Sequence, residues 1–397
     1  MDQTCETIRK RLFKAVDDLA PKAVALSDDL GKNPELGEKE FESSRKHVEL
    51  LREAGYEIEY PFAGIPTAFI AKKGTGHPKV ALLVEYDALP GIGHACGHNV
   101  SGAMSTLAGL ALAAVADELS GQVQVIGTPA EETNGAKVRM SQEGVFDGLD
   151  LALMLHSSGG ISFIHYDCLA MDAIEFTYKG KTSHAAASPW AGRNALNGVQ
   201  LLFHAIDMLR QHVIPDVRMH GIIPVGGEAP NIVPELATAQ FYFRAPKRAI
   251  VDEVVDKALN CARGAAMATE TEVSWEKFET SFDDMLPNGP GEEAMATIME
   301  ELGVKLSPSP GSQGSSDIGN VSYRCPALQP MFAITHRPLT LHTREFSEAT
   351  FLEESHKALV VGAKALAAMT YLVMTDELLR EAMQESFVKG REVDQKK

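Results

Sequence analysis

Short β-rich runs alternate with a long apolar helix in the first third of the chain, and this order constrains the fold more than any other feature of the sequence. The runs are Ala68–Ala71, Val80–Val84 and Val123–Gly127, each bounded by glycine or proline, and residues 101–119 have the composition of a helix. A strand, a helix and a second strand in succession predict a parallel sheet with covered faces. We therefore predict an α/β domain.

A different order begins at Ala170. The elements expected there are strand 172–178, helix 194–211, strands 219–225 and 237–244, helix 250–269 and strand 272–278. This β-α-β-β-α-β succession is typical of a ferredoxin-like α+β unit. We expect an inserted domain at residues 170–284, with residues 1–169 and 285–397 forming the two parts of the surrounding domain.

The segments outside these patterns are expected to be mostly helical. Helices are expected within the first sixty residues and at Gly291–Leu302 and Phe351–Met374, and a strand at Ala327–Ile334. Residues from Val388 onward have the composition of a solvated tail.

Charge and cysteine usage narrow the possible partners and compartments. The formal charge of −17 and the absence of a lysine or arginine run disfavour nucleic acid and anionic membranes as partners. The five scattered cysteines do not form a disulfide framework, and the first residues lack the order of a secretory signal, so we expect a cytoplasmic protein. Ala103–Ala116 comes nearest to a membrane span but is too short, and we expect a buried helix there.

Potential metal ligands of three chemical kinds occur close together in the chain. They are Cys96, His98, Glu131, Glu132 and His156. A thiolate, imidazoles and carboxylates together suit Zn²⁺, Mn²⁺ or Co²⁺ better than Ca²⁺ or Mg²⁺, which prefer oxygen ligands. The combination predicts the transition-metal site of a hydrolytic enzyme.

The predicted strands bring the acidic residues to one edge of the sheet. Glu85 and Asp87 follow the strand at 80–84, and the glutamate pair follows the strand that begins at Val123. In open α/β sheets, ligands bind in the crevice outside the carboxyl ends of the strands. Both groups are therefore expected to face the same crevice.

Each of these residues also has a plain structural explanation. A lone buried cysteine is usually a small hydrophobic residue, and adjacent glutamates are usually exposed. The Cys-x-His spacing beside other ligands favours metal binding for Cys96 and His98. For His156, which ends an apolar run, the segment alone is equally compatible with a core histidine.

Four motifs resemble the M20 family of metallopeptidases. They are Glu85-Tyr86-Asp87-Ala88-Leu89-Pro90, His94-Ala95-Cys96-Gly97-His98-Asn99, Gly127-Thr128-Pro129-Ala130-Glu131-Glu132 and His342-Thr343-Arg344-Glu345-Phe346. The similarity runs in register over nearly the whole chain and is greatest to amidohydrolase subfamily D, which includes aminobenzoyl-glutamate hydrolases and Xaa-Arg dipeptidase-like enzymes. It implies a zinc-peptidase-like catalytic domain with a mainly parallel central sheet, interrupted by a lid or dimerisation domain.

The resemblance also implies roles for individual residues. The metal ligands would be Cys96, as a thiolate able to bridge two ions, His98, Glu132, His156 and His342. Glu131 would take a proton from metal-activated water and return it to the leaving amine. Asp87 is expected to accept a hydrogen bond from a ligand histidine, with a capping role as the alternative.

Three residues near these motifs have less definite roles. His94 is expected to orient its loop by hydrogen bonding, and Glu85 stays unassigned. Asn99 replaces the aspartate that many members of the subfamily have at this position.

Further candidate site residues lie beyond the first motifs. The resemblance implies that His184 reaches the active site of the other subunit and stabilises the oxyanion. Asn231 and Arg244 match substrate-holding positions, and Arg244 suits a carboxylate, although an arginine on a strand surface is the alternative. Gly314 and Ser315 are expected to line the pocket through backbone N–H groups.

Together these features predict a metal-dependent hydrolase that cleaves the amide bond of small N-acyl, aroyl or aminoacyl amino acids. One or two Zn²⁺ or Mn²⁺ ions per subunit are expected, with Co²⁺ also suited, in a homodimer or higher homo-oligomer. Two alternatives stay open: a metal-dependent deaminase of an aromatic amine, and a non-catalytic ligand-binding dimer.

Overall fold

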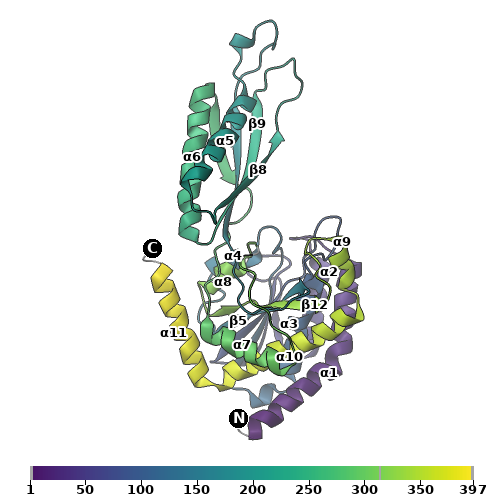
Figure 1. Ribbon diagram of the computed structural model, residues 1–397. Coiled ribbons are helices and arrows are strands. Elements are labelled where there is room, and N and C mark those ends of the chain that lie inside the picture. Colours follow the sequence, from purple (N-terminus) through teal and green to yellow (C-terminus); the bar gives the residue numbers. More distant parts are fainter. Residues whose placement is uncertain (1–2, 313, 395–397) are drawn as a thin grey trace. The chain divides into compact units, whose positions relative to one another are not determined.

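The computed structural model describes residues 3–312 and 314–394, and the chain divides into two compact units (Figure 1). Unit 1 consists of the described residues of Met1–Asp167, Met285–Gly311 and Asp317–Lys397, and unit 2 of those of Cys168–Asp284 and Ser312–Ser316. The segment Ser312–Ser316 was expected to belong with residues 285–397, but it lies in unit 2. Its backbone is attached there, because the Leu169 N–H donates to Gly314 O at 2.7 Å.

Unit 1 contains a six-stranded sheet with the order β1-β2-β4-β3-β5-β11. Its strands are β1 (Glu57–Glu59), β2 (Phe69–Thr75), β3 (Lys79–Val84), β4 (Gly121–Gly127), β5 (Leu151–Leu153) and β11 (Ala327–Leu328). β3 pairs in parallel with β4 and β5, and β5 with β11, whereas β2 pairs antiparallel with β4 and β1. A separate parallel pair joins β6 (His156–Gly159) to β12 (Met331–Thr335). The predicted α/β fold with a mainly parallel central sheet is confirmed.

The register of β3 and β4 positions the residues that follow them. Val80–Val84 is buried throughout, as expected of a parallel strand covered on both faces. Val84 lies opposite Gly127, so both strands end at the same level of the sheet. The loops that begin at Glu85 and at Thr128 therefore leave the sheet side by side.

Helices pack around this sheet, and three of them, α1, α3 and α10, contact one another (Figure 1). The helices of unit 1 are α1 (Gln3–Lys32), α2 (Phe41–Glu53), α3 (His98–Ala113), α4 (Ala136–Gln142), α7 (Gly289–Glu301), α8 (Ile318–Ser322), α9 (Arg344–Ala349), α10 (Glu353–Thr375) and α11 (Glu377–Asp394), with a 3₁₀ turn, η1, at Ala116–Glu118. α3 packs closely against β3 and the residue that follows it. A Cβ on Gly102 would lie 2.2 Å from the carbonyl oxygen of Glu85, so this close approach requires glycine.

The buried helix expected at Ala103–Ala116 is confirmed as part of α3, which ends at Ala113, whereas two other expectations about apolar and terminal segments need correction. Among the described residues, one helix is long and apolar enough by composition to cross a membrane, and it is α10 rather than Ala103–Ala116. In the structure, 67% of its most apolar window is buried inside the protein. The segment from Val388 is helical, as the end of α11, which continues to Asp394, but Val388, Lys389, Arg391 and Glu392 are exposed as expected of a solvated segment. Residues 395–397 lie outside the described part.

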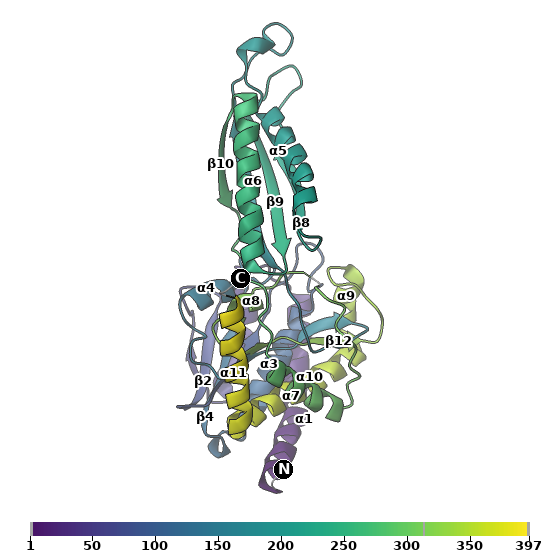
Figure 2. The same ribbon diagram turned by 60° about the vertical axis from the view of Figure 1, so that its left-hand side comes forward.

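Unit 2 is a four-stranded antiparallel sheet with the order β10-β7-β9-β8 and two helices. Its elements in chain order are β7 (Ala170–Lys179), η2 (Pro189–Ala191), α5 (Ala195–Leu209), η3 (Arg210–His212), β8 (Arg218–Val225), β9 (Leu236–Ala245), α6 (Arg248–Thr269) and β10 (Glu272–Lys277). α5 and α6 pack against each other and against β7 and β9 (Figure 2). Buried aromatic side chains at alternate positions, such as Phe241 and Phe243 on β9, form this core. The predicted ferredoxin-like order is confirmed.

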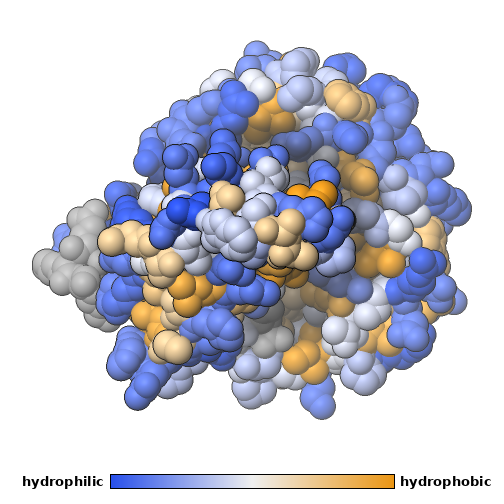
Figure 3. Space-filling model, turned by 90° about the horizontal axis from the view of Figure 1, so that it is seen from above, coloured by the Kyte–Doolittle hydropathy of each residue, from blue (hydrophilic) through white to orange (hydrophobic). Residues whose placement is uncertain are grey.

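The face shown in Figure 3 is mostly hydrophilic, with hydrophobic side chains in small groups between the polar ones. This agrees with the high content of acidic residues in the sequence.

Candidate metal centre

The five predicted metal ligands, Cys96, His98, Glu132, His156 and His342, lie close together in unit 1. Glu132 lies in the loop after β4, and Cys96 lies in the turn before α3, which begins at His98. His156 is the first residue of β6, and His342 lies in the loop before α9. Four separate segments of the chain therefore contribute to one place.

Possible ligand atoms of these residues and of Glu131 approach one another in three groups, each with all atoms within 4.8 Å. The groups are Cys96 with His98 and His156, Cys96 with Glu132 and His342, and His98 with Glu131 and Glu132. The Cys96 sulfur lies 3.5 Å from His156 Nε2, and Glu132 Oε1 lies 3.3 Å from His342 Nε2. His342 is the exposed member, with 54% of its side chain accessible, so the centre is open on that side.

The donor atoms fit a divalent transition metal. His98 Nε2 and Glu132 Oε1 are buried and make no well-aligned hydrogen bond among the described residues, although buried polar atoms are nearly always paired. Each has only an ionisable neighbour at 3.3 Å, Glu85 Oε2 for His98 Nε2 and His342 Nε2 for Glu132 Oε1. Sulfur, imidazole nitrogen and carboxylate oxygen within reach of one another are the ligands of Zn²⁺ and similar ions. Cys96 belongs to two of the groups, as a thiolate shared between two ions would.

Asp87 contacts two of the predicted ligands at once. His98 Nδ1 lies 3.1 Å from Asp87 Oδ1 and 3.0 Å from the Asp87 carbonyl oxygen, and the Glu132 N–H donates to Asp87 Oδ2 at 2.9 Å. Because both neighbours of Nδ1 are acceptors, Nδ1 carries a proton, which leaves Nε2 as the atom that would bind a metal ion. Burial raises the pKa of Asp87, but His98 and these hydrogen bonds outweigh it and keep the pKa below its usual value.

His156 is oriented in the same way by the backbone. Its Nδ1 donates to the Ser157 carbonyl oxygen at 2.9 Å, which leaves Nε2 unprotonated on the side of Cys96. The sequence alone left this histidine open between ligand and core, and its ring nitrogen lies within reach of both Cys96 and His98.

The backbone adopts left-handed conformations at several positions in the centre. Gly97 has φ 78°, and a Cβ there would lie 2.6 Å from the Ser157 Cβ, so the turn between Cys96 and His98 requires glycine. Ala130 and His342 both have φ 62°. Such conformations cost free energy in residues other than glycine and are concentrated at functional sites.

Glu40 stabilises one of these conformations, a role that no pattern in the sequence indicates. Its Oε1 accepts the Ala130 N–H at 2.8 Å, and its Oε2 accepts a hydrogen bond from Thr67 Oγ1 at 3.0 Å. Burial and the charge of Asp87 raise the pKa of Glu40 to about 7. A buried carboxylate thus holds the residue directly before Glu131.

Negative charge is concentrated around Glu131. Burial raises the pKa of Glu131 well above its usual value, and Glu85, Glu132 and Asp317 raise it further. Burial also raises the pKa of Cys96. Divalent cations would favour the ionised forms of both groups.

Lys137 supplies a positive charge that the sequence analysis missed. Its ammonium group lies 2.7 Å from Glu85 Oε1 and 2.6 Å from Asp317 Oδ1, with all three side chains fully buried. Oxygens of Glu85, Glu131 and Asp317 form a fourth compact group, but Lys137 already contacts two of these three carboxylates. We therefore exclude this group from the metal centre.

Two residues that flank Cys96 and His98 in the motif 94–99 do not join the ligand groups. His94 is buried and belongs to none of the ligand groups, and neither ring nitrogen has a hydrogen-bond partner in the described part of the chain. The expected loop-orienting hydrogen bond of His94 is therefore not observed. Asn99 donates to the Ser27 carbonyl oxygen of α1 at 3.2 Å.

The remaining predicted site residues lie in unit 2. His184 is exposed and pairs with Ile232 in an isolated bridge, and the Ala185 N–H donates to Asn231 O at 3.0 Å. His184 Nδ1 accepts the N–H groups of Ala186 and Ala187 at 3.2 and 3.1 Å. With Nδ1 as acceptor, the neutral ring carries its proton on Nε2 and can donate from there.

Arg244 contacts the loop that contains Gly314 and Ser315. Its Nη1 donates to Ser315 Oγ at 3.1 Å, and Gly314 lies beside Ser315 on the same segment. The sequence predicted these three residues for one substrate pocket, and all three lie in unit 2.

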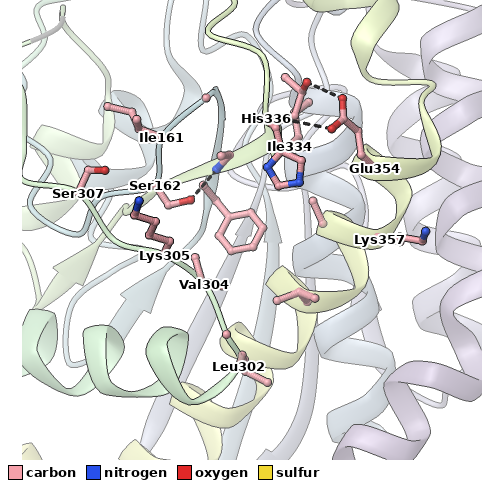
Figure 4. Close-up of a pocket in the computed structure, with 17 residues that line it drawn as sticks. Ile161, Ser162, Leu302, Val304, Lys305, Ser307, Ile334, His336, Glu354 and Lys357 are labelled. Carbon is pink, nitrogen blue, oxygen red and sulfur yellow. Dashed lines mark hydrogen bonds between the residues drawn. The ribbon is translucent and has the colours of Figure 1, made fainter.

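A separate cavity of about 520 Å³ lies in unit 1 near β12 and α10 (Figure 4). Glu354 of α10 lines one side of the cavity. Its carboxylate accepts hydrogen bonds from Thr335 Oγ1 at 2.6 Å and from the His336 N–H at 3.2 Å. None of the predicted ligands lines this cavity, so it is distinct from the metal centre.

Comparisons with known proteins agree with this geometry. A family model described as peptidase family M20/M25/M40 matches residues 81–371. A Xaa-Arg dipeptidase of Mus musculus is 35% identical over 96% of this chain and 92% of its own length, and a p-aminobenzoyl-glutamate hydrolase polypeptide of Escherichia coli (strain K12) is 28% identical over 95% of each chain. The solved structure of a dinuclear metal binding peptidase of the M20 family from Bacillus subtilis superposes with a TM-score of 0.68, covering 90% of this chain and 99% of that one, at 20% identity.

Replacing Asp87 by asparagine is expected to weaken metal binding about 10- to 100-fold, the usual cost of losing a partner that orients a ligand. An amide can still accept from His98, but its NH₂ group would face the Glu132 N–H, and the negative charge is lost. Titration of metal-free protein with Zn²⁺ measures the effect. Asp150→Asn is the control, because Asp150 accepts the Lys79 N–H at 2.7 Å at the opposite end of β3. Unchanged affinity in Asp87→Asn would show that Asp87 does not orient the ligands.

Proposed function

The chain belongs to peptidase family M20/M25/M40, and from this membership and the geometry of the metal centre we propose that it hydrolyses the amide bond of small N-acyl, aroyl or aminoacyl amino acids. The observation that carries the proposal is the approach of sulfur, nitrogen and oxygen donors to one another beside Glu131. Similarity over nearly the full length to a dipeptidase and to an aminobenzoyl-glutamate hydrolase supports an amino acid conjugate as the substrate.

The proposed ligands are Cys96, His98, Glu132, His156 and His342, and we propose that they hold one or two Zn²⁺ or Mn²⁺ ions, with Co²⁺ as an active substitute. A divalent cation held there would polarise the amide carbonyl and lower the pKa of water to about 7.

Glu131 is the proposed general base and acid. Its carboxylate takes a proton from the attacking water as the water oxygen bonds to the carbonyl carbon. When the C–N bond breaks, Glu131 returns that proton to the leaving amine nitrogen. The two neighbouring glutamates thus have different roles: Glu132 binds metal, and Glu131 transfers the proton.

His184 is the proposed donor to the oxyanion, acting on the active site of a second subunit. The hydrogen bonds from Ala186 and Ala187 keep the proton on Nε2, which is the form that donates. A homodimer is supported by β8, an edge strand with exposed Ile222, Ile223 and Val225 at 62%, 42% and 40% accessibility. Apolar residues on an exposed edge strand favour pairing with another chain.

The proposed substrate end is a carboxylate. The guanidinium of Arg244, beside Ser315 and Gly314, is suited to bind a carboxylate in a bidentate manner, with Asn231 as a further polar contact. The charge of −17 would also favour cationic substrates such as Lys- or Arg-containing dipeptides at low salt.

The reaction class is tested by incubating metal-free protein, reloaded with Zn²⁺, Mn²⁺ or Co²⁺, with a panel of dipeptides and acyl or aroyl amino acids. The expected products are a free amino acid and the corresponding acid or second amino acid. Ammonia release from an aromatic amine without an amino acid product would identify a deaminase instead. Binding without turnover on the whole panel would contradict the proposal.

Replacing Glu131 by glutamine is expected to lower kcat about 10²- to 10⁴-fold without loss of metal, because the amide cannot accept the proton. Steady-state kinetics and metal analysis of the purified protein measure both quantities. Glu143→Gln, an exposed glutamate paired with Arg139 at the end of α4, is the control and should retain the wild-type rate. An active Glu131→Gln enzyme would refute the assignment of the base.

Sharing of the active site between subunits is tested by mixing two inactive variants, Glu131→Gln and His184→Ala. Each mixed dimer would contain one site with both defects and one intact site, so random exchange restores about a quarter of the wild-type activity. Each variant exchanged with itself should stay inactive. No recovery in dimers shown to have exchanged would place the action of His184 within its own subunit.

A further inference from the structure

Lys137 is a charged residue in the interior of unit 1 that the proposed reaction does not use. It is the second residue of α4 and is fully buried. Lysine is almost never fully buried unless it is paired, and its ammonium group contacts Glu85 Oε1 at 2.7 Å and Asp317 Oδ1 at 2.6 Å.

The ion pairs lie directly beside the proposed base. Carboxylate oxygens of Glu85, Glu131 and Asp317 all lie within 4.8 Å of one another, so Lys137 binds two of three clustered carboxylates and Glu131 is the third. Among the described residues, no hydrogen-bond donor contacts the Glu131 carboxylate. Its direction therefore depends on the surrounding charges and on the loop that carries it.

Lys137 also fixes the end of that loop. Its own N–H donates to Asp317 Oδ2 at 3.1 Å, so backbone and side chain of Lys137 bind the same carboxylate. Within the loop, the Gly135 N–H donates to Ala130 O at 2.7 Å. Glu40 holds the start of the loop at Ala130, and Lys137 holds its end.

We propose that Lys137 is a positioning residue for Glu131. Its ion pairs with Glu85 and Asp317 join the end of β3, the start of α4 and the start of α8 behind the base. They fix the loop and balance the negative charge, so that the Glu131 carboxylate stays directed toward His98 and Glu132. This inference rests on the proposed function, because it takes Glu131 as the group that moves the proton.

The test compares Lys137→Met with wild-type protein in kcat, KM, bound metal and thermal stability. We expect kcat to fall about 10- to 100-fold, the effect of misplacing a catalytic group by about 1 Å, with KM within about threefold and bound metal unchanged. Lys364→Met is the matched control. It removes a lysine of α10 that is 20% exposed and pairs with Asp17 at 2.7 Å, and it should keep the wild-type kcat.

A second variant separates positioning from stability. Lys137→Met leaves buried carboxylates without their partner and can lower stability or prevent folding. Lys137→Met combined with Asp317→Asn removes one charge of each sign, so stability should recover while kcat stays low. Recovery of kcat together with stability would overturn the proposal, and so would a wild-type kcat or a loss of bound metal in Lys137→Met.

If Lys137 acts by positioning Glu131, the loss of kcat in Lys137→Met must also depend on Glu131. In the Glu131→Gln background, adding Lys137→Met is expected to leave the residual rate unchanged, whereas independent effects would multiply. A further 10-fold or larger loss there would contradict the inference. If the wild-type protein hydrolyses none of the amides tested, the proposed function is wrong. If the wild-type protein is active and Lys137→Met has the same kcat, only the inference about Lys137 is wrong.

Discussion

The parallel pairing of β3 with β4 is the constraint on which the metal centre depends. Because Val84 lies opposite Gly127, the chain leaves both strands at the same edge of the sheet. Asp87 from one loop and Glu132 from the other are thereby close enough to share a hydrogen bond of 2.9 Å. A slip of this register would separate Asp87, which contacts His98, from Glu132, the glutamate proposed to bind metal beside it.

Burying so many acidic groups in one crevice is unfavourable unless each has a partner. The structure provides partners for several of these carboxylates. Asp87 accepts hydrogen bonds from His98 and Glu132, Glu40 accepts the Ala130 N–H, and Glu85 binds Lys137. Glu132 remains with a buried oxygen that lacks a well-aligned hydrogen bond among the described residues, and it is the glutamate that we assign to metal.

Local patterns predicted the parts of this protein that depend on neighbouring residues in the chain. The apolar run at β3 and the β-α-β-β-α-β order of unit 2 are visible in sequence because strands and helices have distinct periodicities. Lys137 and Glu40 were missed because their burial depends on contacts with residues far away in the chain. Lys137 reaches Asp317, 180 positions along the sequence, and a lysine in a short helix otherwise suggests an exposed side chain. The attachment of Ser312–Ser316 to unit 2 likewise depends on contacts far along the chain, among them the hydrogen bonds from Leu169 and Arg244, that no composition reveals.

The central claim is that sulfur, nitrogen and oxygen donors from separate segments bind a common metal ion. X-ray absorption spectroscopy of the zinc-loaded protein tests it directly, because sulfur and lighter ligands differ in scattering and in bond length. We predict a sulfur shell at about 2.3 Å beside nitrogen and oxygen ligands at about 2.0–2.2 Å, with the sulfur shell lost in Cys96→Ser. A zinc spectrum without a sulfur ligand, unchanged by the removal of Cys96, would contradict the account.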